Sequence, residues 1–361
     1  MTAFVTTVRG LRGAQKLFSD AAPIYISRAP GRLDVMGGNV DYTGGLVCEA
    51  TIREATWAAA QRRTDQTILV VNPQMDALGW AQRVETANSQ LSDAAKTRKL
   101  VNSDPRMRWT AYVLGVFHLL QNRWPEQTRN GMTIYLESDV PLNKGVSSSA
   151  AVEVATMKAA AAAYGIPLHG IELAEACQWV ENVIAESACG IMDQATSVLG
   201  TEGNLLPLLC QPCHLEDPVG LPEELSLWAI DSGVKHAVTG IEYEAARAAA
   251  FVGYRMICEA ESLSITFEES GKIPRYVDPL WNGYLSNLSP SLFRSRYESS
   301  LPKRISGHDL LKEDKLHPDP FTQIREEASY PVRSCTRYAI EEQQRIVSFV
   351  ELLRGLDQRP R

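Results

Sequence analysis

Apolar residues recur at three- and four-residue steps in several long stretches of the chain, a spacing that places them on one face of a helix. Residues 150–164 are also rich in alanine, and Gly165 and Pro167 follow them as stop signals. A weaker pattern of the same period covers residues 1–20. We therefore predict helices at 1–20, 109–120, 150–164, 171–186, 241–262 and from residue 337 onward.

Shorter runs that alternate, or that are apolar throughout, predict strands. The first of them, 24–27, is expected to break at Pro30-Gly31. Between residues 263 and 333 the composition shifts to Ser, Pro, Glu, Tyr and Lys, which predicts an insertion of loops and short helices. The predicted strands are 24–27, 46–52, 57–62, 67–71, 132–136 and 225–230.

Length and composition limit the classes of protein to consider. A chain of 361 residues exceeds what one compact core usually serves, so we expect two domains. The formal net charge of -7 offers no basic surface for nucleic acid or for an anionic membrane. The sequence contains no apolar run of about 18 residues and no signal-peptide pattern. We therefore predict a soluble cytoplasmic protein without nucleic-acid or membrane partners.

The seven cysteines are scattered along the chain, and their odd number does not suit a disulfide framework. Cys210 and Cys213 form a lone C-x-x-C with neither a second pair nor a flanking histidine cluster. A zinc site needs a complete set of ligands, which this pair does not supply. The cysteines are therefore expected to be reduced.

The segment from Pro141 to Ala151, PLNKGVSSSAA, joins a predicted strand to the alanine-rich helix. Free backbone N–H groups and the helix dipole at a helix N-terminus attract phosphate. A serine hydroxyl there can cap the helix and can also bind Mg²⁺. Simple capping by Ser147 or Ser148 and phosphate binding therefore both fit the segment. It is not a Walker loop, because G-x-x-x-x-G-K-[ST] is absent.

This segment resembles the second motif of the GHMP kinases, which cradles the phosphates of ATP in that family. Residues 31–45 resemble the first motif of the galactokinase branch, GRVNLIGEHTDYNGG, and residues 189–194 match its CGIMDQ. Residues 231–236 with Tyr243, and residues 330–342, resemble two further segments of that branch. Because the five matches follow the family's order, the chain is identified as similar to the galactokinase branch.

The resemblance implies an α+β chain with the GHMP kinase fold. Residues 1–215 are expected to form an N-terminal GHMP kinase domain that resembles domain 2 of ribosomal protein S5 and binds sugar and ATP. Residues 216–361 are expected to form an incomplete ferredoxin-like domain that carries the insertion 263–333. The third GHMP motif has no match before Arg361. We therefore expect either a fragment or a shortened protein.

The resemblance also implies an ATP-dependent kinase that uses Mg²⁺. Asp193 is expected to accept the proton of a sugar hydroxyl, with Arg32 beside it to stabilise charge; a helix cap and a structural ion pair are the alternatives. Glu181, twelve residues before Asp193, and Ser149 are the implied Mg²⁺ ligands, and Glu186 competes with Glu181. Trp109 either stacks on adenine or belongs to the core. The other implied nucleotide contacts are Lys144, Gly145, Val146, Ser147, Ser148, Ser149 and Ala150.

The implied sugar contacts are Asp34, Asp41, Gly190 and Tyr243. Galactokinases carry Glu-His where this chain has Gly38-Asn39, and that glutamate reaches the C6 hydroxyl of galactose. Plant-type L-arabinokinases resemble this chain at the same place, and L-arabinose lacks the C6 hydroxymethyl group. The sequence therefore favours phosphorylation of the anomeric hydroxyl of L-arabinose or of a galactose-like sugar. The missing third motif favours the alternative, a regulator that binds sugar and ATP without turnover.

Overall fold

The computed structural model describes residues 2–13, 16–222, 224–233, 241–267, 273–312 and 317–357. The chain divides into two compact units. Unit 1 comprises residues 1–32, 51–187 and 193–199, and unit 2 comprises residues 33–50, 188–192 and 200–361. Strands β1 (Tyr25–Met36) and β2 (Leu46–Arg62) contribute residues to both units.

The strands of unit 1 follow the order β4-β3-β5-β2, and β1 also pairs with β2. β3 runs parallel to β5, whereas the β3–β4 and β2–β5 pairs are antiparallel. The strands not yet defined are β3 (Thr67–Val71), β4 (Arg83–Ala87) and β5 (Met132–Ser138).

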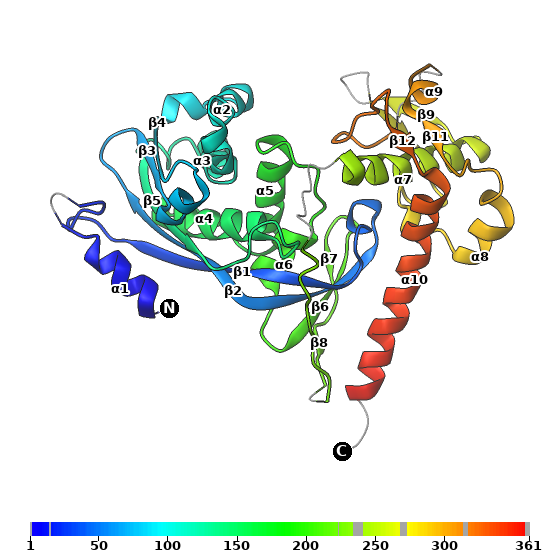
Figure 1. The fold of residues 1–361 in the computed structure, drawn as a ribbon, viewed down its shortest axis with the longest axis horizontal. Helices are drawn as coiled ribbons and strands as arrows, with labels where there is room; N and C mark the ends of the chain where they lie inside the picture. The colour runs from blue at the N-terminus through cyan, green and yellow to red at the C-terminus, as the bar shows by residue number, and fades with distance from the viewer. Residues whose placement is uncertain are drawn as a thin grey trace. The chain divides into compact units, whose positions relative to one another are not determined.

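The helices of unit 1 bury their apolar residues against this sheet, and Figure 1 shows α3, α4 and α5 gathered on one side of its strands. Successive side chains of β2 point to opposite faces of the sheet. Ala58 and Ala60 belong to the core formed with α3, α4 and α5, whereas Ala59 packs with Phe4 and Val8 of α1 on the other face. The helices are α1 (Thr2–Gly10), α2 (Ala94–Val101), α3 (Ala111–Arg123), α4 (Ser148–Tyr164), α5 (Gly170–Val183) and α6 (Met192–Leu199), with short turns η2 (Pro73–Leu78), η3 (Asn88–Leu91) and η4 (Pro105–Thr110).

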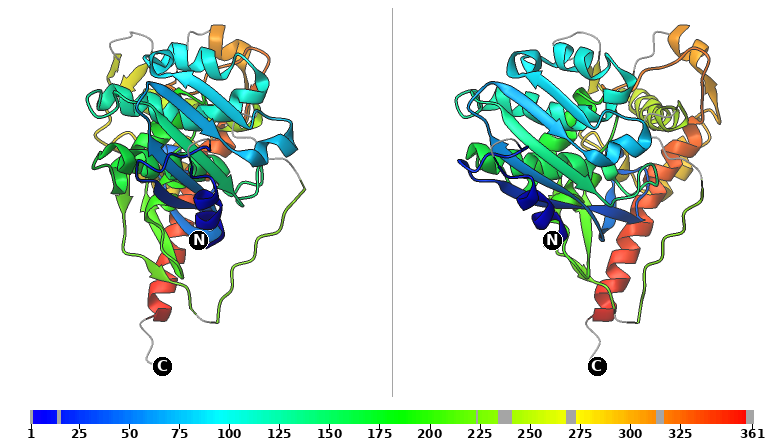
Figure 2. Two further views of the ribbon diagram at one scale, coloured as in Figure 1. Left: turned by 90° about the vertical axis from the view of Figure 1, so that its left-hand side faces the viewer. Right: turned by 60° about the vertical axis from the view of Figure 1, so that its left-hand side comes forward.

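Unit 2 holds the first residues of β2, which pair with β6, and β6 also pairs with β7 and β8. A core of unit 2 lies where α7 packs against α10, and the right-hand view of Figure 2 shows these two helices beside each other. Its elements are η1 (Asp41–Thr43), β6 (Asn204–Leu209), β7 (His214–Leu215), β8 (Val219–Gly220), α7 (Ile241–Ala260), β9 (Ile265–Phe267), β10 (Pro274–Tyr276), η5 (Leu285–Asn287), α8 (Pro290–Leu292), η6 (Phe293–Tyr297), β11 (Ile305–Ser306), α9 (Gly307–Lys312), β12 (Ser329–Tyr330) and α10 (Val332–Asp357).

Several predicted elements differ from the structure. The strand expected to break at Pro30-Gly31 continues as β1 to Met36, and the two runs predicted over 46–62 form the single strand β2. The helix predicted over 1–20 ends at Gly10, and Trp109 lies in η4 before α3 begins. Residues 14 and 15 of the first prediction lie outside the described residues.

The strand predicted at Leu225–Ile230 is wrong, because the structure has no strand there. Trp228 and Ile230 are 88% and 92% exposed, so among the described residues this run has neither a neighbouring strand nor an apolar surface that covers it. An isolated strand is not stable without a partner, whatever its pattern of side chains.

The mixture of helices and sheet agrees with the predicted α+β class. The domain boundary after residue 215 and the likeness of the domains to ribosomal protein S5 and to ferredoxin stay predictions. Among the described residues, no helix combines the length and the apolar character needed to cross a membrane.

Candidate active site

The loop between β5 and α4 carries the serine-rich motif in an unusual backbone conformation. Asn143, Gly145 and Ser147 all adopt left-handed φ angles, of 57°, 70° and 59°. Ser147 is the N-cap residue of α4, yet its side chain makes no capping hydrogen bond. Its hydroxyl oxygen is buried and has no protein partner. The capping alternative for Ser147 therefore does not hold, and a polar group remains available at this helix N-terminus.

Arg32 of β1 and Asp193 of α6 form an ion pair beside this loop. The Nη2 and Nε atoms of Arg32 donate to Oδ1 of Asp193 at 2.6 Å and 2.9 Å. Nη1 donates to the backbone carbonyl of Gly145 at 2.8 Å. Both side chains are largely buried, with exposed fractions of 8% and 19%. The structure thus brings together the predicted base, its arginine and the serine-rich loop, all within unit 1.

The predicted Mg²⁺ ligands also lie together. Glu181 of α5 is buried, and the side chain of Ser149 is hydrogen bonded to it. Burial and then the charge of Asp193 raise the pKa of Glu181 to about 7, while the hydrogen bond with Ser149 acts in the opposite direction. The competing Glu186 is exposed and lies 3.6 Å from Arg98. The structure therefore places Glu181 beside Ser149.

The donor atoms of this pair suit Mg²⁺, which prefers oxygen ligands and takes few of them from protein. Among the described residues there is no cluster of three or more His, Cys, Asp or Glu side chains that could hold a metal alone. A cation at Ser149 and Glu181 would therefore draw the rest of its ligands from phosphate and water.

Two further residues lie beside Glu181: Glu153, for which the sequence predicts no role, and Gln194, which the sequence marks only as the last residue of a motif. Glu153 is buried in α4, and burial followed by the charge of Glu181 raises its pKa well above the ordinary range. Gln194 is fully buried and donates from Nε2 to Oε2 of Glu181 at 2.7 Å and to Oε2 of Glu153 at 3.2 Å. Glu153 follows Ser149 by four positions, so helical spacing would have placed it on the same face.

The predicted sugar contacts lie in unit 2. Asp41 is buried in η1. A Cβ added to Gly190 would lie 1.7 Å from the Oδ2 atom of Asp41. The ring of Tyr243 meets that of Tyr42 edge to face at 6.2 Å between centroids. Burial, and next the charge of Asp41, raise the pKa of Tyr243. The Oδ1 atom of Asp34, on β1, is buried without a hydrogen-bond partner.

Arg247 of α7 is a further buried residue that sequence reasoning did not find. Its guanidinium lies 4.8 Å from the ring centroid of Tyr42 and pairs with Asp319 at 2.8 Å. It thus supports the tyrosine that follows Asp41. Residues 234–236 of the matching segment lie outside the described residues.

The predicted nucleotide contacts other than the serines differ in their exposure to solvent. Lys144 and Gly145 are exposed on the loop, and Ala150 is buried. Trp109 is partly buried against the core of unit 1, and its indole N–H donates to the carbonyl of Ala81 at 3.0 Å. Its stacking on adenine stays a prediction.

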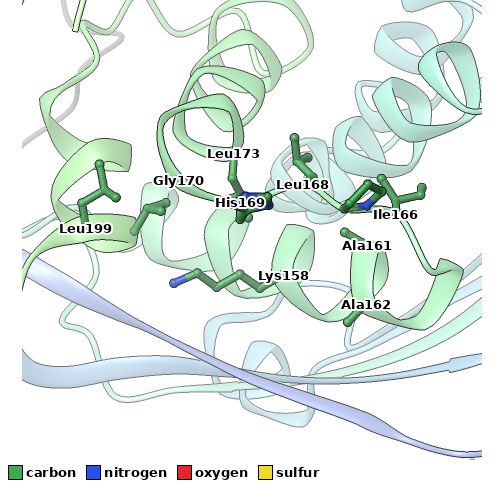
Figure 3. A pocket seen from close by; sticks show the side chains of 11 residues that line it. Lys158, Ala161, Ala162, Ile166, Leu168, His169, Gly170, Leu173 and Leu199 are labelled. Atoms are coloured by element: carbon green, nitrogen blue, oxygen red, sulfur yellow. The ribbon is translucent and has the colours of Figure 1, made fainter. Parts of the chain in front are cut away.

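A separate hollow of about 350 Å³ lies at the ends of α4, α5 and α6 (Figure 3). Lys158, His169, Leu173 and Leu199 line it. None of the predicted site residues is among its lining residues. It is therefore distinct from the site built on the serine-rich loop.

Two family models match the chain. The model described as the GHMP kinases N terminal domain matches residues 111–201, and the one described as the galactokinase galactose-binding signature matches residues 15–62. These ranges include the serine-rich loop, Glu181 and Asp193 in the first case and Arg32 with Asp41 in the second.

Curated proteins with similar sequences are sugar kinases by name. An L-arabinokinase of Arabidopsis thaliana is 36% identical and aligns with 96% of this chain but 37% of its own length. A galactokinase of Chloroflexus aurantiacus is 34% identical over 65% of this chain and 56% of its own. This chain therefore spans well under two thirds of either relative.

The crystal structure of Lactococcus lactis galactokinase complexed with galactose superposes with a TM-score of 0.68. The match covers 98% of this chain and 74% of that one, at 18% identity, so it shows the fold. The family models and the relatives show that this chain is similar to GHMP kinases of the galactokinase type.

Proposed function

We propose that the protein is a sugar kinase that transfers the γ-phosphoryl group of ATP to the anomeric hydroxyl of L-arabinose or of a galactose-like sugar. The Arg32–Asp193 ion pair beside the serine-rich loop is the observation that carries the proposal. A carboxylate positioned by an arginine next to a phosphate-binding helix N-terminus is the arrangement that phosphoryl transfer requires.

In this mechanism Asp193 accepts the proton of the sugar hydroxyl. The sugar oxygen forms a bond to the γ-phosphorus, the bond from that phosphorus to the β,γ-bridging oxygen breaks, and ADP leaves. Ser147 and the backbone N–H groups of α4 hold the phosphates, and Arg32 offsets developing negative charge. Ser149 and Glu181 would hold Mg²⁺, which supplies charge neutralisation on the phosphates.

The preference for a pentose rests on Gly38. Its φ of 57° lies in the left-handed region that favours glycine, and an added Cβ would lie 2.5 Å from the hydroxyl of Tyr338. Gly38 has no side chain to contact a C6 hydroxyl, and any side chain placed there would have to displace the hydroxyl of Tyr338. Asp34, Asp41, Gly190 and Tyr243 are proposed to contact the remaining part of the sugar.

Incubation with Mg-ATP and a panel of L-arabinose, D-galactose and related sugars, followed by measurement of ADP release, tests the proposal. We expect L-arabinose to give the highest kcat/KM. Thermal stabilisation by sugar and ATP without ADP release would instead support a binding regulator. A chain that neither releases ADP nor is stabilised by these ligands would refute both.

A further inference from the structure

We propose that Gln194 and Glu153 are positioning residues that hold the carboxylate of Glu181 in place for a divalent cation. The inference rests on the proposed function, because that function assigns Glu181 to the metal. The observation that carries it is the pair of hydrogen bonds from Gln194 Nε2 to Glu181 Oε2 and Glu153 Oε2, at 2.7 Å and 3.2 Å.

In the structure the side-chain amide nitrogen of Gln194 is the donor in both bonds. A side-chain amide nitrogen carries two hydrogens and accepts none, so one Nε2 atom can serve two carboxyl oxygens at once. The opposite amide orientation would place a carbonyl oxygen against both of them. Gln194 and Glu153 are fully buried and Glu181 is 2% exposed, so water cannot replace these contacts.

The arrangement also connects the metal ligand to the proposed base. Asp193 and Gln194 are neighbours in the first turn of α6, and they bind Arg32 and Glu181 respectively. Glu153 stands one helical turn after Ser149 on α4, and Ser149 is hydrogen bonded to Glu181. One turn of α6 and one turn of α4 therefore fix Glu181 from two sides.

Stability alone does not account for this cluster. The Oε1 atom of Glu153 is buried without a hydrogen-bond partner, and burying such an atom costs free energy. Groups that orient a metal ligand commonly affect metal affinity by about 10- to 100-fold. Glu153 accepts a bond from Gln194 and is also hydrogen bonded to Glu181. A glutamine in its place keeps both a carbonyl acceptor and an N–H donor, so it should serve equally well.

The experiment measures Mn²⁺ binding by electron paramagnetic resonance in the presence of ADP, together with metal-free ADP binding and thermal unfolding. We expect Gln194→Leu and Glu153→Leu to weaken Mn²⁺ affinity about tenfold or more, with metal-free ADP affinity within about twofold of wild type. Glu153→Gln should retain wild-type Mn²⁺ affinity. The matched control is Gln61→Leu, since Gln61 is also a buried amide, 4% exposed, that donates to the carbonyls of Ser19 and Ala22.

The inference is overturned if Gln194→Leu and Gln61→Leu change Mn²⁺ affinity equally. In that case, Mg²⁺-dependent ADP release by the wild-type protein would still uphold the proposed function. Absence of Mn²⁺ binding by wild type with ADP would overturn both. If Gln194→Leu does not fold, the comparison of Glu153→Leu with Glu153→Gln decides: equal Mn²⁺ affinity in these two variants contradicts the positioning role.

Discussion

Arg32 places two of its guanidinium nitrogens on the same oxygen of Asp193, at 2.6 Å and 2.9 Å. A fork-like bidentate pair would instead use both carboxylate oxygens. Because both of these bonds end on Oδ1, Oδ2 of Asp193 is the oxygen we expect to meet the sugar hydroxyl. The third guanidinium nitrogen holds the carbonyl of Gly145, so the arginine ties the carboxylate to the loop.

Replacing Asp193 tests this relationship. We expect Asp193→Asn to lower the rate of sugar-dependent ADP release by about 10²- to 10⁴-fold, because the amide cannot accept the proton. Circular dichroism should show a folded chain. The control is Asp65→Asn, which removes a carboxylate paired with Arg63 by bonds of 2.6 Å and 2.7 Å at a more exposed position. Comparable losses of rate in both variants would contradict a catalytic role for Asp193.

Gly190 allows the carboxylate of Asp41 to approach the chain closely. In Gly190→Ala the new Cβ would lie 1.7 Å from Oδ2 of Asp41, so the carboxylate must move. If Asp41 contacts the sugar, the KM for sugar should rise about tenfold, a loss equivalent to about 1.4 kcal/mol, while the KM for ATP changes little. Gly355→Ala, at a helix position with open space around it, is the control. An unchanged KM for sugar in a folded Gly190→Ala protein would count against Asp41.

Tyr338 restricts the position at Gly38. Gly38→Ala should lower the free energy of unfolding by at least about 1 kcal/mol more than Gly79→Ala does, because crowding adds to backbone strain. Gly79 has a similar φ of 71° but nothing within 4 Å of an added Cβ. The Tyr338→Phe background removes the hydroxyl at 2.5 Å and should reduce the difference. Chemical denaturation measures the free energy of unfolding of Gly38→Ala, Gly79→Ala, Tyr338→Phe and the double variant Gly38→Ala/Tyr338→Phe. Equal losses of this free energy in Gly38→Ala and Gly79→Ala would contradict crowding by Tyr338.

His317 is expected to make unit 2 sensitive to acid. Burial lowers its pKa to about 4 from the ordinary 6.5, so the unfolded chain binds the proton more readily between these values. Stability should therefore fall as the pH drops from about 6.5 towards 4, by about 2 kcal/mol at about pH 5. In His317→Asn, whose side-chain oxygen can still accept from the N–H of Asp319, this loss should be smaller.

The matched control for the acid prediction is His308→Asn. His308 is exposed, and its pKa is raised by its hydrogen bond with Glu326, so its removal should not protect the fold at low pH. Thermal unfolding between about pH 4.5 and 7 compares the three proteins. Parallel pH profiles for wild type and His317→Asn would show that His317 is not the group responsible.

The sequence by itself determined the helices whose signals are local. Residues 150–164 combine alanine with a terminal glycine, and α4 runs from Ser148 to Tyr164 with Gly165 as its left-handed C-cap. The motif matches likewise led to Asp193, Arg32, Glu181 and Ser149, which lie near one another in unit 1. Helix propensity and sequence motifs depend on residues that are close together in the chain, so both can be recognised from the sequence directly.

The tertiary structure alone decided what depends on distant neighbours. Leu225–Ile230 has the pattern of a strand but no adjacent strand in the described part of the chain, whereas β1 continues through Pro30-Gly31 because β2 lies beside it. The two bonds of Gln194 join residues 13 and 41 positions away, which no local pattern specifies. Strand pairing and the burial of charge are set by long-range contacts, and these exist only once the chain has folded.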